Sequence, residues 1–241
     1  MVDINKILRN GKGLILAYDH GFEYGPEDFN ENSVDPEWIM GIAESGYFTG
    51  FVCHKGIAAK YYNPLIHEVP LIIKLNGKTS QSKKVEPLAL QNCSIEDAVR
   101  LGAVAVGYTI YLGSKHEQKM IQEFSKIEST AHENGLIVIA WMYTEKTDLL
   151  PYAGRLGMEL NADVVNLKYT GEAKSFEWVV KNTGRTKLFV IGGPRTDTAY
   201  QLLETAKAVT SVGANGLTVG RNIWQAKHPL EIAKQLAEII F

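Results

Sequence analysis

The chain has 241 residues, of which 45% are hydrophobic and 22% are charged, so it is long enough to bury one large core. Its net charge of -2 and the absence of a dense Lys or Arg run exclude the basic surface of a nucleic-acid-binding protein. The first residues lack the apolar core of a signal peptide, and no apolar run is long enough to span a bilayer, so we expect a cytoplasmic protein with no membrane partner.

Short apolar runs rich in Val, Ile and Leu recur along the chain, and turn-forming residues follow them. They predict eight strands, at residues 14–18, 48–54, 71–76, 103–109, 136–142, 163–169, 187–193 and 216–220. Segments with helical spacing predict helices at 35–45, 94–101, 114–134, 148–161, 172–181, 196–212 and 229–240, with at most a short helix at 56–62. Residues 76–92 are too polar for the core, and we expect a small hairpin there.

Strands that alternate with helices indicate a parallel sheet. Eight such units in one chain of this length fit a single-domain (β/α)8 TIM barrel over residues 1–241 better than an open doubly wound sheet, which usually has five or six units. In a TIM barrel the chemistry lies at the carboxyl ends of the strands. The residues at those ends are therefore the candidate functional residues.

Lys168 ends the predicted strand at 163–169 and is followed at once by a turn. A lysine stem that leaves a buried strand loses part of its hydration, which favours the neutral amine that imine formation requires. We therefore predict that Lys168 is a Schiff-base nucleophile. The alternative is that it is one of the many solvated surface charges.

Two more strand ends carry groups suited to acid–base chemistry or substrate binding. Tyr143 ends the strand next to that of Lys168 and is suited to proton transfer, although a rim aromatic that packs against a loop is the alternative. Asp19 follows the first strand and is suited to binding a substrate hydroxyl or steering protons, or else to pairing with a lysine such as Lys74. In the same loop, His20 and Asp28 join Asp19 as candidate substrate-binding residues.

Glycines follow the last two predicted strands. Gly192 and Gly193 come after the seventh strand, and Gly220 with Arg221 comes after the eighth. Backbone N–H groups in such turns surround a phosphate at the recurrent phosphate site of this fold, and Arg221 adds positive charge. Each motif alone is compatible with a tight turn, but the pair predicts a phosphate site.

We predict no catalytic metal and no cofactor. His20, His54 and Asp19 are potential ligands, as in metal-dependent aldolases of the same fold, but no His-x-His or His-x-x-x-His pair occurs at a strand end. Cys53 and Cys93 lack the paired spacing of a disulfide framework or a metal cluster, and we expect both to be reduced and buried.

Several strings of the chain resemble the archaeal-type class I fructose-1,6-bisphosphate aldolases. They are AYDHGFEYGP (17–26), LIIKLNGKT (71–79), NCSIEDA (92–98), GYTIYLG (107–113), LKYTG (167–171), GGP (192–194) and VGRNIW (219–224). The resemblance covers nearly the whole chain. It implies a metal-independent aldolase on a TIM barrel that reversibly cleaves fructose 1,6-bisphosphate to dihydroxyacetone phosphate and glyceraldehyde 3-phosphate.

The resemblance also implies roles for individual residues. Lys168 forms an iminium with dihydroxyacetone phosphate, Tyr143 donates and accepts protons, and Asp19 helps to bind the substrate. The residues implied to line the site or to hold the phosphate of the ketone half are Trp141, Gly192, Gly193, Gly220 and Arg221. Members of the family are homo-oligomers, often pentamers or decamers, and their partners are small sugar phosphates.

Three positions depart from the family pattern. Tyr24 replaces a histidine, Glu145 replaces an arginine, and Ile191 replaces a serine. The first two belong to the end of the pocket that receives the aldehyde's phosphate, where Lys146 or Lys55 are candidates to compensate. The connection after the Tyr143 strand is also shorter than usual.

Two other functions fit the same residues. One is a related synthase that uses the same lysine and tyrosine to make an aromatic amino acid precursor from sugar phosphates, although the LNGKT string favours the bisphosphate aldolase. The other is a non-catalytic barrel that keeps only the phosphate site.

Overall fold

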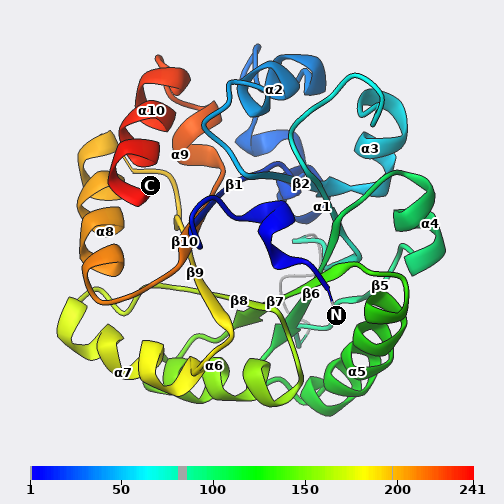
Figure 1. Ribbon diagram of the computed structural model, residues 1–241, viewed down its shortest axis with the longest axis vertical. Helices are drawn as coiled ribbons and strands as arrows, with labels where there is room; N and C mark the ends of the chain where they lie inside the picture. Colours follow the sequence, from blue (N-terminus) through cyan, green and yellow to red (C-terminus); the bar gives the residue numbers. More distant parts are fainter. Residues whose placement is uncertain (1, 81–85, 197) are drawn as a thin grey trace.

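The computed structural model describes residues 2–80, 86–196 and 198–241, and in them eight parallel strands close into a barrel (Figure 1). In order around the barrel, the strands are β1 (Gly13–Ala17), β10 (Gly216–Val219), β9 (Lys187–Ile191), β8 (Val164–Leu167), β7 (Ile137–Tyr143), β6 (Ala105–Tyr111), β3 (Leu71–Lys74) and β2 (Gly50–His54). All eight predicted strands are confirmed, and no strand end differs from its prediction by more than two residues. The expected (β/α)8 barrel is therefore the observed fold.

Helices surround the barrel as an outer ring (Figure 1). They are α2 (Pro36–Ala43), α3 (Lys55–Tyr61), α4 (Ile95–Arg100), α5 (Glu117–Glu133), α6 (Leu150–Glu159), α7 (Ala173–Thr183), α8 (Ala199–Ser211) and α10 (Pro229–Ile240). These match the predicted helices, apart from residue 197 of the predicted 196–212 helix, which lies outside the described residues. No helix of the described residues is long and apolar enough to cross a membrane.

The helix ends follow local chemistry that the sequence signals. The Asp35 side chain accepts a hydrogen bond from the backbone N–H of Glu37, and Pro36 occupies the first turn of α2. Ser94 caps α4 by accepting from the N–H of Asp97 at 3.1 Å. Gly135, with φ of 70°, follows the end of α5 in a conformation that glycine adopts without steric cost.

Short elements that were not predicted lie at both ends of the barrel. Helix α1 (His20–Tyr24) and the 3-10 helix η2 (Gly25–Asp28) follow β1, and helix α9 (Arg221–Trp224) follows β10. The 3-10 helix η3 (Thr147–Leu149) precedes α6 and falls largely within the helix predicted at 148–161. The 3-10 helix η1 (Ile4–Ile7) precedes β1 and packs against the barrel interior. The hairpin expected within 76–92 is present as antiparallel β4 (Asn76–Gly77) and β5 (Leu90–Gln91), although residues 81–85 lie outside the described residues.

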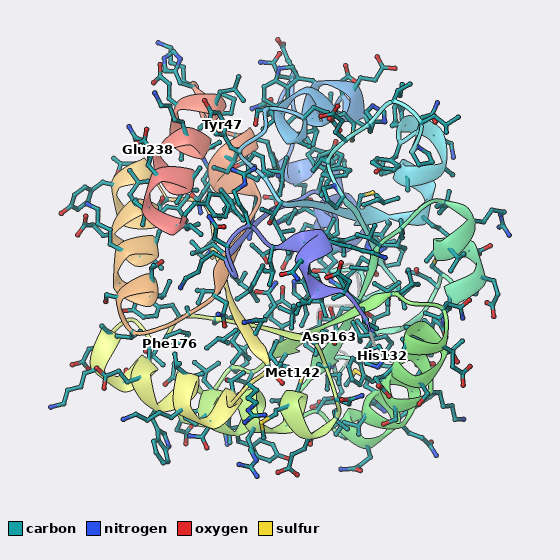
Figure 2. The ribbon with its side chains drawn as sticks, in the orientation of Figure 1. Tyr47, His132, Met142, Asp163, Phe176 and Glu238 are labelled. Carbon is teal, nitrogen blue, oxygen red and sulfur yellow. The ribbon has the colours of Figure 1, made fainter. Side chains whose placement is uncertain are left out.

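Side chains alternate between two cores along each strand. On β7, Ile139, Trp141 and Tyr143 belong to the core inside the barrel, whereas Met142 belongs to the layer between the barrel and the helices, with Phe176 of α7 (Figure 2). Because both faces are buried, the strands have continuous apolar sequences, which explains why they were predictable.

A polar contact joins α5 to the start of β8. His132 Nε2 lies 2.9 Å from Asp163 Oδ2, and the same oxygen accepts a hydrogen bond from the backbone N–H of Val138 (Figure 2). The other ring nitrogen of His132 lies 2.8 Å from Glu128 Oε1. These contacts fix the amino end of the barrel and lie away from the strand ends where the candidate site residues gather.

Candidate active site

A cavity of about 910 Å³ opens at the carboxyl ends of the barrel strands. Nine of the predicted site residues line it: Asp19, His20, Trp141, Tyr143, Lys168, Gly192, Gly193, Gly220 and Arg221. Asp28 does not line the cavity, but its carboxylate binds Arg221 Nη1 at 3.1 Å. The structure therefore brings the predicted residues together from strands that are far apart in the sequence.

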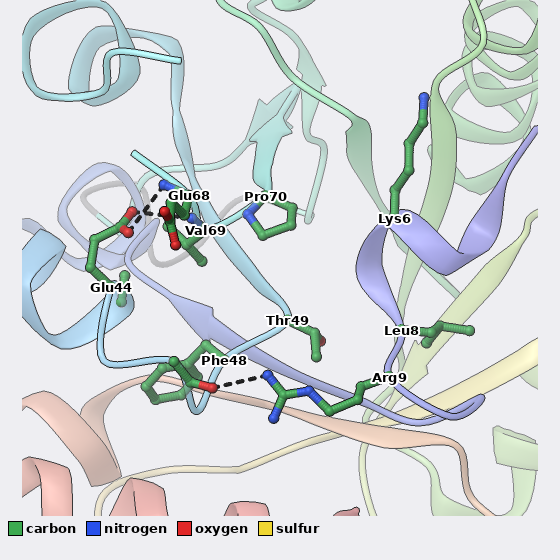
Figure 3. A pocket seen from close by; sticks show the side chains of 11 residues that line it. Lys6, Leu8, Arg9, Glu44, Phe48, Thr49, Glu68, Val69 and Pro70 are labelled. Atoms are coloured by element: carbon green, nitrogen blue, oxygen red, sulfur yellow. Dashed lines mark hydrogen bonds between the residues drawn. The ribbon is translucent and has the colours of Figure 1, made fainter. Parts of the chain in front are cut away.

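A smaller hollow of about 340 Å³ lies at the amino end of the barrel (Figure 3). The carboxylate of Glu44 accepts hydrogen bonds from the backbone N–H groups of Glu68 and Val69, and Arg9 donates to the carbonyl of Gly46 at 3.0 Å. Its polar side chains thus hold loops together, and none of the predicted site residues lies there.

Lys168 is the first residue after β8, and its exposed side chain lines the cavity. The expectation that its stem loses hydration is wrong, because β8 ends at Leu167 and the lysine leaves the barrel wall instead of lying within it. Tyr143 ends the neighbouring strand β7 and lines the same cavity. The amine is thus accessible to a ligand, and a phenol comes from the adjacent strand.

Lys74, the last residue of β3, is buried, with only 1% of its side chain exposed. Its Nζ donates a hydrogen bond to Asp19 Oδ2 at 3.0 Å and lies 4.9 Å from the centre of a Trp141 ring. Burial alone raises the pKa of the Asp19 carboxyl, but the Lys74 ammonium outweighs burial and holds that pKa well below its usual range. The alternative role considered for Asp19, pairing with Lys74, is therefore present, and Asp19 also faces the cavity.

Glu23 is a cavity residue that the sequence analysis missed. It is buried, lies one helical turn after Asp19 in α1, and has Oε1 at 4.0 Å from Lys74 Nζ. Burial, with the nearby Asp19 carboxylate, raises the pKa of Glu23 to about 7 against the opposing effect of Lys74. The i, i+4 spacing from Asp19 was the available signal, but it required the prediction of α1.

The Tyr143 ring stacks on that of Tyr111, with centroids 5.6 Å apart. The packing role considered for Tyr143 is therefore present, together with access to the cavity. Burial and then the carboxylates of Glu23 and Asp19 raise the pKa of Tyr143 well above its ordinary value. At neutral pH the hydroxyl keeps its proton, so Tyr143 is poised to act first as a donor.

The two glycine turns form one wall of the cavity. Gly193 has a φ of 74°, which favours glycine, and Gly220 lies so close to β1 that a Cβ there would be 2.9 Å from the carbonyl oxygen of Ala17. Gly193 is exposed and Gly192 and Gly220 are half-buried, so both turns reach the cavity surface, although the N–H of Gly192 already donates to the carbonyl of Thr218 at 2.8 Å.

Asn222, also missed from the sequence, connects these turns. Its amide Nδ2 donates to the carbonyls of Gly192 at 3.1 Å and Pro194 at 2.9 Å, and its Oδ1 accepts from the backbone N–H and the hydroxyl of Thr196. One buried side chain of α9 therefore fixes the loop after β9 against the turn after β10.

The two histidines near Asp19 are held neutral. Burial lowers the pKa of His20, whose Nδ1 lies 3.5 Å from Asp19 Oδ1, and burial lowers the pKa of His54 to about 4. The His54 ring packs on the Phe22 ring, with the ring centroids 4.6 Å apart. The described residues contain no group of three or more His, Cys, Asp or Glu side chains that could hold a metal ion, and the metal-free site stays a prediction. Cys53 and Cys93 are buried free thiols, as expected.

Of the three positions that depart from the family pattern, two line the cavity and one does not. Tyr24 and Ile191 line the cavity, and the Arg221 guanidinium lies 5.2 Å from the centre of the Tyr24 ring. Glu145 is exposed and does not line it. Lys146 does not line the cavity and Lys55 lies 3.6 Å from Asp97, and compensation by either lysine stays a prediction.

Comparisons with known proteins agree with this geometry. The sequence model of the DeoC/LacD aldolase family matches residues 13–226. The chain is 44% identical to the class 1 fructose-bisphosphate aldolase of Thermoproteus tenax over 97% of this chain and 91% of that protein. It is 37% identical to the same-named enzyme of Halobacterium salinarum, over 98% of this chain and 92% of that protein.

Solved structures show the same likeness. One is an archaeal fructose-1,6-bisphosphate aldolase with its catalytic Lys covalently bound to the carbinolamine intermediate of the substrate, at 43% identity and a TM-score of 0.92 over 98% of this chain and 97% of that chain. Another, a Schiff-base-forming aldolase studied through its reaction intermediates, has 43% identity and a TM-score of 0.93 over 98% of both chains.

Proposed function

Because this chain belongs to the DeoC/LacD family of aldolases, we propose that it is a class I fructose-1,6-bisphosphate aldolase that works through a Schiff base on Lys168. The observation that carries the proposal is the cavity itself. An accessible lysine and a protonated tyrosine end neighbouring strands, and two glycine turns with an arginine face the same space. A lysine, a proton carrier and a phosphate site are the groups that imine-based cleavage of a sugar phosphate needs.

The reaction begins at the C2 carbonyl of the bound sugar bisphosphate. The Lys168 amine adds to this carbon and gives a carbinolamine. Tyr143 donates its proton to the departing hydroxyl, so water leaves and an iminium and a phenolate remain. The glycine turns and Arg221 hold the phosphate next to C2, which orients the carbonyl for attack.

Cleavage then uses the iminium as an electron sink. The Tyr143 phenolate takes the proton of the C4 hydroxyl, the C3–C4 bond breaks, and an aldehyde and an enamine form. Tyr143 returns the proton to C3 of the enamine. Water adds to the resulting iminium, and its hydrolysis releases dihydroxyacetone phosphate and the free lysine. Asp19, whose carboxylate accepts a hydrogen bond from Lys74, binds the substrate hydroxyls in this proposal.

Borohydride trapping tests the proposal. Dihydroxyacetone phosphate and borohydride should label the wild-type chain on the peptide that contains Lys168, and Lys168→Arg should abolish both labelling and cleavage because a guanidinium does not form this imine. Lys174→Arg, at an exposed lysine of α7, is the matched control and should retain both. Labelling of another lysine, or full activity of Lys168→Arg, contradicts the assignment.

A second activity has one observation in its favour. The relative from Methanocaldococcus jannaschii, 31% identical over 97% of this chain, is named a fructose-bisphosphate aldolase/6-deoxy-5-ketofructose 1-phosphate synthase. Reverse aldol cleavage of 6-deoxy-5-ketofructose 1-phosphate gives dihydroxyacetone phosphate and methylglyoxal, so methylglyoxal is the acceptor aldehyde in its synthesis. The rates at which dihydroxyacetone phosphate condenses with glyceraldehyde 3-phosphate and with methylglyoxal therefore distinguish the two activities.

The remaining parts of the proposal concern the assembly and its surroundings. The protein is a cytoplasmic homo-oligomer, a pentamer or decamer, that uses sugar phosphates without a metal ion. Leu65 and Ile66, exposed to 90% and 71%, support an apolar contact surface between subunits. Light scattering measures the assembly, and cleavage that persists after EDTA treatment tests metal independence.

A further inference from the structure

In the wall of the cavity, two buried carboxyl groups lie near one buried ammonium group. Lys74 Nζ lies 3.0 Å from Asp19 Oδ2 but 4.0 Å from Glu23 Oε1, and Glu23 Oε1 has no hydrogen-bond partner among the described residues. The ammonium therefore binds Asp19 directly and Glu23 only at a distance. A buried carboxylate with an unsatisfied oxygen is unfavourable, and adding a proton removes its charge.

The burial of Glu23 favours the same protonation state, against the net effect of the cations around it. The titratable and charged groups that interact with Glu23 are Asp19, Tyr24, Lys74, Lys78, Tyr111, Tyr143 and Arg221. His20 and His54 act on its neighbour Asp19. Of the cations, Lys74 is engaged by Asp19 and Arg221 by Asp28. Burial, with a smaller contribution from Asp19, outweighs the opposing effects of Lys74, Lys78 and Arg221 and raises the pKa of Glu23 to about 7.

We propose that Glu23 holds a proton in the working site, and that this neutral carboxyl is a positioning residue that enables Tyr143 to exist as the phenolate between proton transfers. The inference rests on the proposed aldol cleavage, in which the phenolate forms as water leaves and is consumed when the C4 hydroxyl gives up its proton. Glu23 itself exchanges no atom with the substrate.

The physical reason is charge repulsion. An ionised Glu23 is the foremost of the carboxylates that oppose loss of the Tyr143 proton, ahead of Asp19. Asp19 keeps its charge because Lys74 stabilises it, so Glu23 is the carboxyl whose charge can be removed. A proton on Glu23 leaves one negative group near the phenolate instead of two.

The test is the pH dependence of single-turnover fructose 1,6-bisphosphate cleavage in three proteins. The cleavage rate of wild type should fall by about tenfold for each pH unit above the pKa of Glu23, since only the protein with a protonated Glu23 is active. Glu23→Gln keeps the size and is always neutral, so it should lack this decline. Glu27→Gln, an exposed carboxyl of η2, is the matched control and should behave as wild type.

Two outcomes contradict the inference. If Glu23→Gln shows the same alkaline decline as wild type, another group is responsible. If the cleavage rate of Glu23→Gln is more than about 100-fold below that of wild type at every pH while borohydride still labels Lys168, the ionised carboxylate is the required form.

A measurement on the free protein keeps the inference separate from the proposed reaction. In wild-type protein with isotope-labelled glutamate, infrared spectroscopy should detect a protonated carboxyl band at pH 6 that is lost by about pH 8.5. Absence of the band at pH 6 rejects the inference even if the Glu23→Gln variant fails to fold. If the band is present but wild type gives no Lys168 adduct with dihydroxyacetone phosphate, the proposed function fails and the protonation of Glu23 stands.

Discussion

Lys74 and Lys168 both come at the carboxyl ends of barrel strands, β3 and β8, but their surroundings differ completely. Lys74 is enclosed and bound to Asp19, so its ammonium serves as a fixed charge. Lys168 is exposed within the cavity, so its amine can reach a carbonyl. The same residue type therefore supplies a buried positive charge at one strand end and the proposed nucleophile at another, and burial distinguishes the two.

Glu23 should also affect stability in a pH-dependent way. Its pKa is about 7 in the folded chain against an ordinary value of 4.5, so the folded state binds more protons than the unfolded state between these values. The stability that Glu23 contributes is fully present below about pH 4.5 and is lost as the pH rises through 7. Glu23→Gln does not titrate, so its stability relative to wild type should increase by about 2–3 kcal/mol between pH 5 and pH 8.

Urea unfolding of both proteins at the two pH values measures this difference. Glu27→Gln, which changes an exposed carboxyl, should show almost no change relative to wild type. A stability difference between Glu23→Gln and wild type that is the same at pH 5 and pH 8 contradicts a raised pKa.

Removal of the Tyr143 hydroxyl should separate imine formation from carbon–carbon cleavage. Tyr143→Phe keeps the ring that stacks on Tyr111 but loses the proton carrier, so cleavage should slow by about 10²–10⁴-fold. The adduct with dihydroxyacetone phosphate should form more slowly but remain trappable on Lys168. Rapid-quench kinetics with borohydride measures both steps, and near-normal cleavage reduces Tyr143 to a packing residue.

Among the elements, the loop after β9 depends on a side chain from the turn after β10. Asn222→Asp keeps the shape of the side chain but removes the two N–H donors that hold the carbonyls of Gly192 and Pro194. Each lost hydrogen bond leaves an acceptor unsatisfied, at a cost of about 1–3 kcal/mol, so the KM for dihydroxyacetone phosphate in the condensation direction should rise by about 10-fold or more.

The KM for unphosphorylated dihydroxyacetone should change much less, because the loop holds the phosphate in the proposed site. Asn182→Asp is the matched control, since Asn182 lies on α7 and binds only the carbonyl of Trp178. Steady-state kinetics with the two ketones distinguishes the roles. Equal losses with both ketones indicate that Asn222 supports the whole barrel instead of the phosphate loop.

The sequence predicted the barrel strands and their functional ends for a physical reason. Strands buried on both faces have continuous apolar runs, and a parallel barrel gathers its strand ends at one rim, so Lys168, Tyr143 and the glycine turns were expected to meet. Helix α1 was missed because its HGFEY sequence is short and contains Gly21, with Gly25 directly after it. Without α1, the burial of Glu23 was unpredictable, because Lys74 is far away in the sequence.

At the scale of the whole molecule, the barrel closes where β1 meets β10. Gly13 and Gly216 face each other in this pairing, and a Cβ on Gly216 would lie 2.1 Å from the carbonyl oxygen of Gly13. The obstructing atoms are backbone, which cannot rotate away, so this approach requires glycine. Further contacts cross the same seam, from Lys12 to the carbonyl of Ala214 and from the Trp224 indole N–H to the carbonyl of Ala17.

Gly216→Ala should therefore lower the free energy of unfolding by about 1–3 kcal/mol or more, as expected when a core is overpacked. Gly41→Ala is the control in which the added methyl group has space, because Gly41 is exposed within α2 and a Cβ there meets no atom within 4 Å. That change should stabilise the chain by up to about 1 kcal/mol through helix propensity. Thermal and urea unfolding measure both, and a neutral Gly216→Ala means that the seam can open to admit a methyl group.

The seam has a consequence for how the protein is made on the ribosome. One wall of the cavity comes from the segment after β1, and the adjoining wall includes Gly220 and Arg221, which follow β10, the last barrel strand in chain order. Until β10 emerges, β1 and β9 each present an unpaired edge, and such edges invite association with other chains. At about 5–20 residues per second, the nascent chain spends many seconds in this open state. A partial translation product that lacks β10 also lacks Gly220 and Arg221, so the proposed phosphate site is complete only after β10 joins β1.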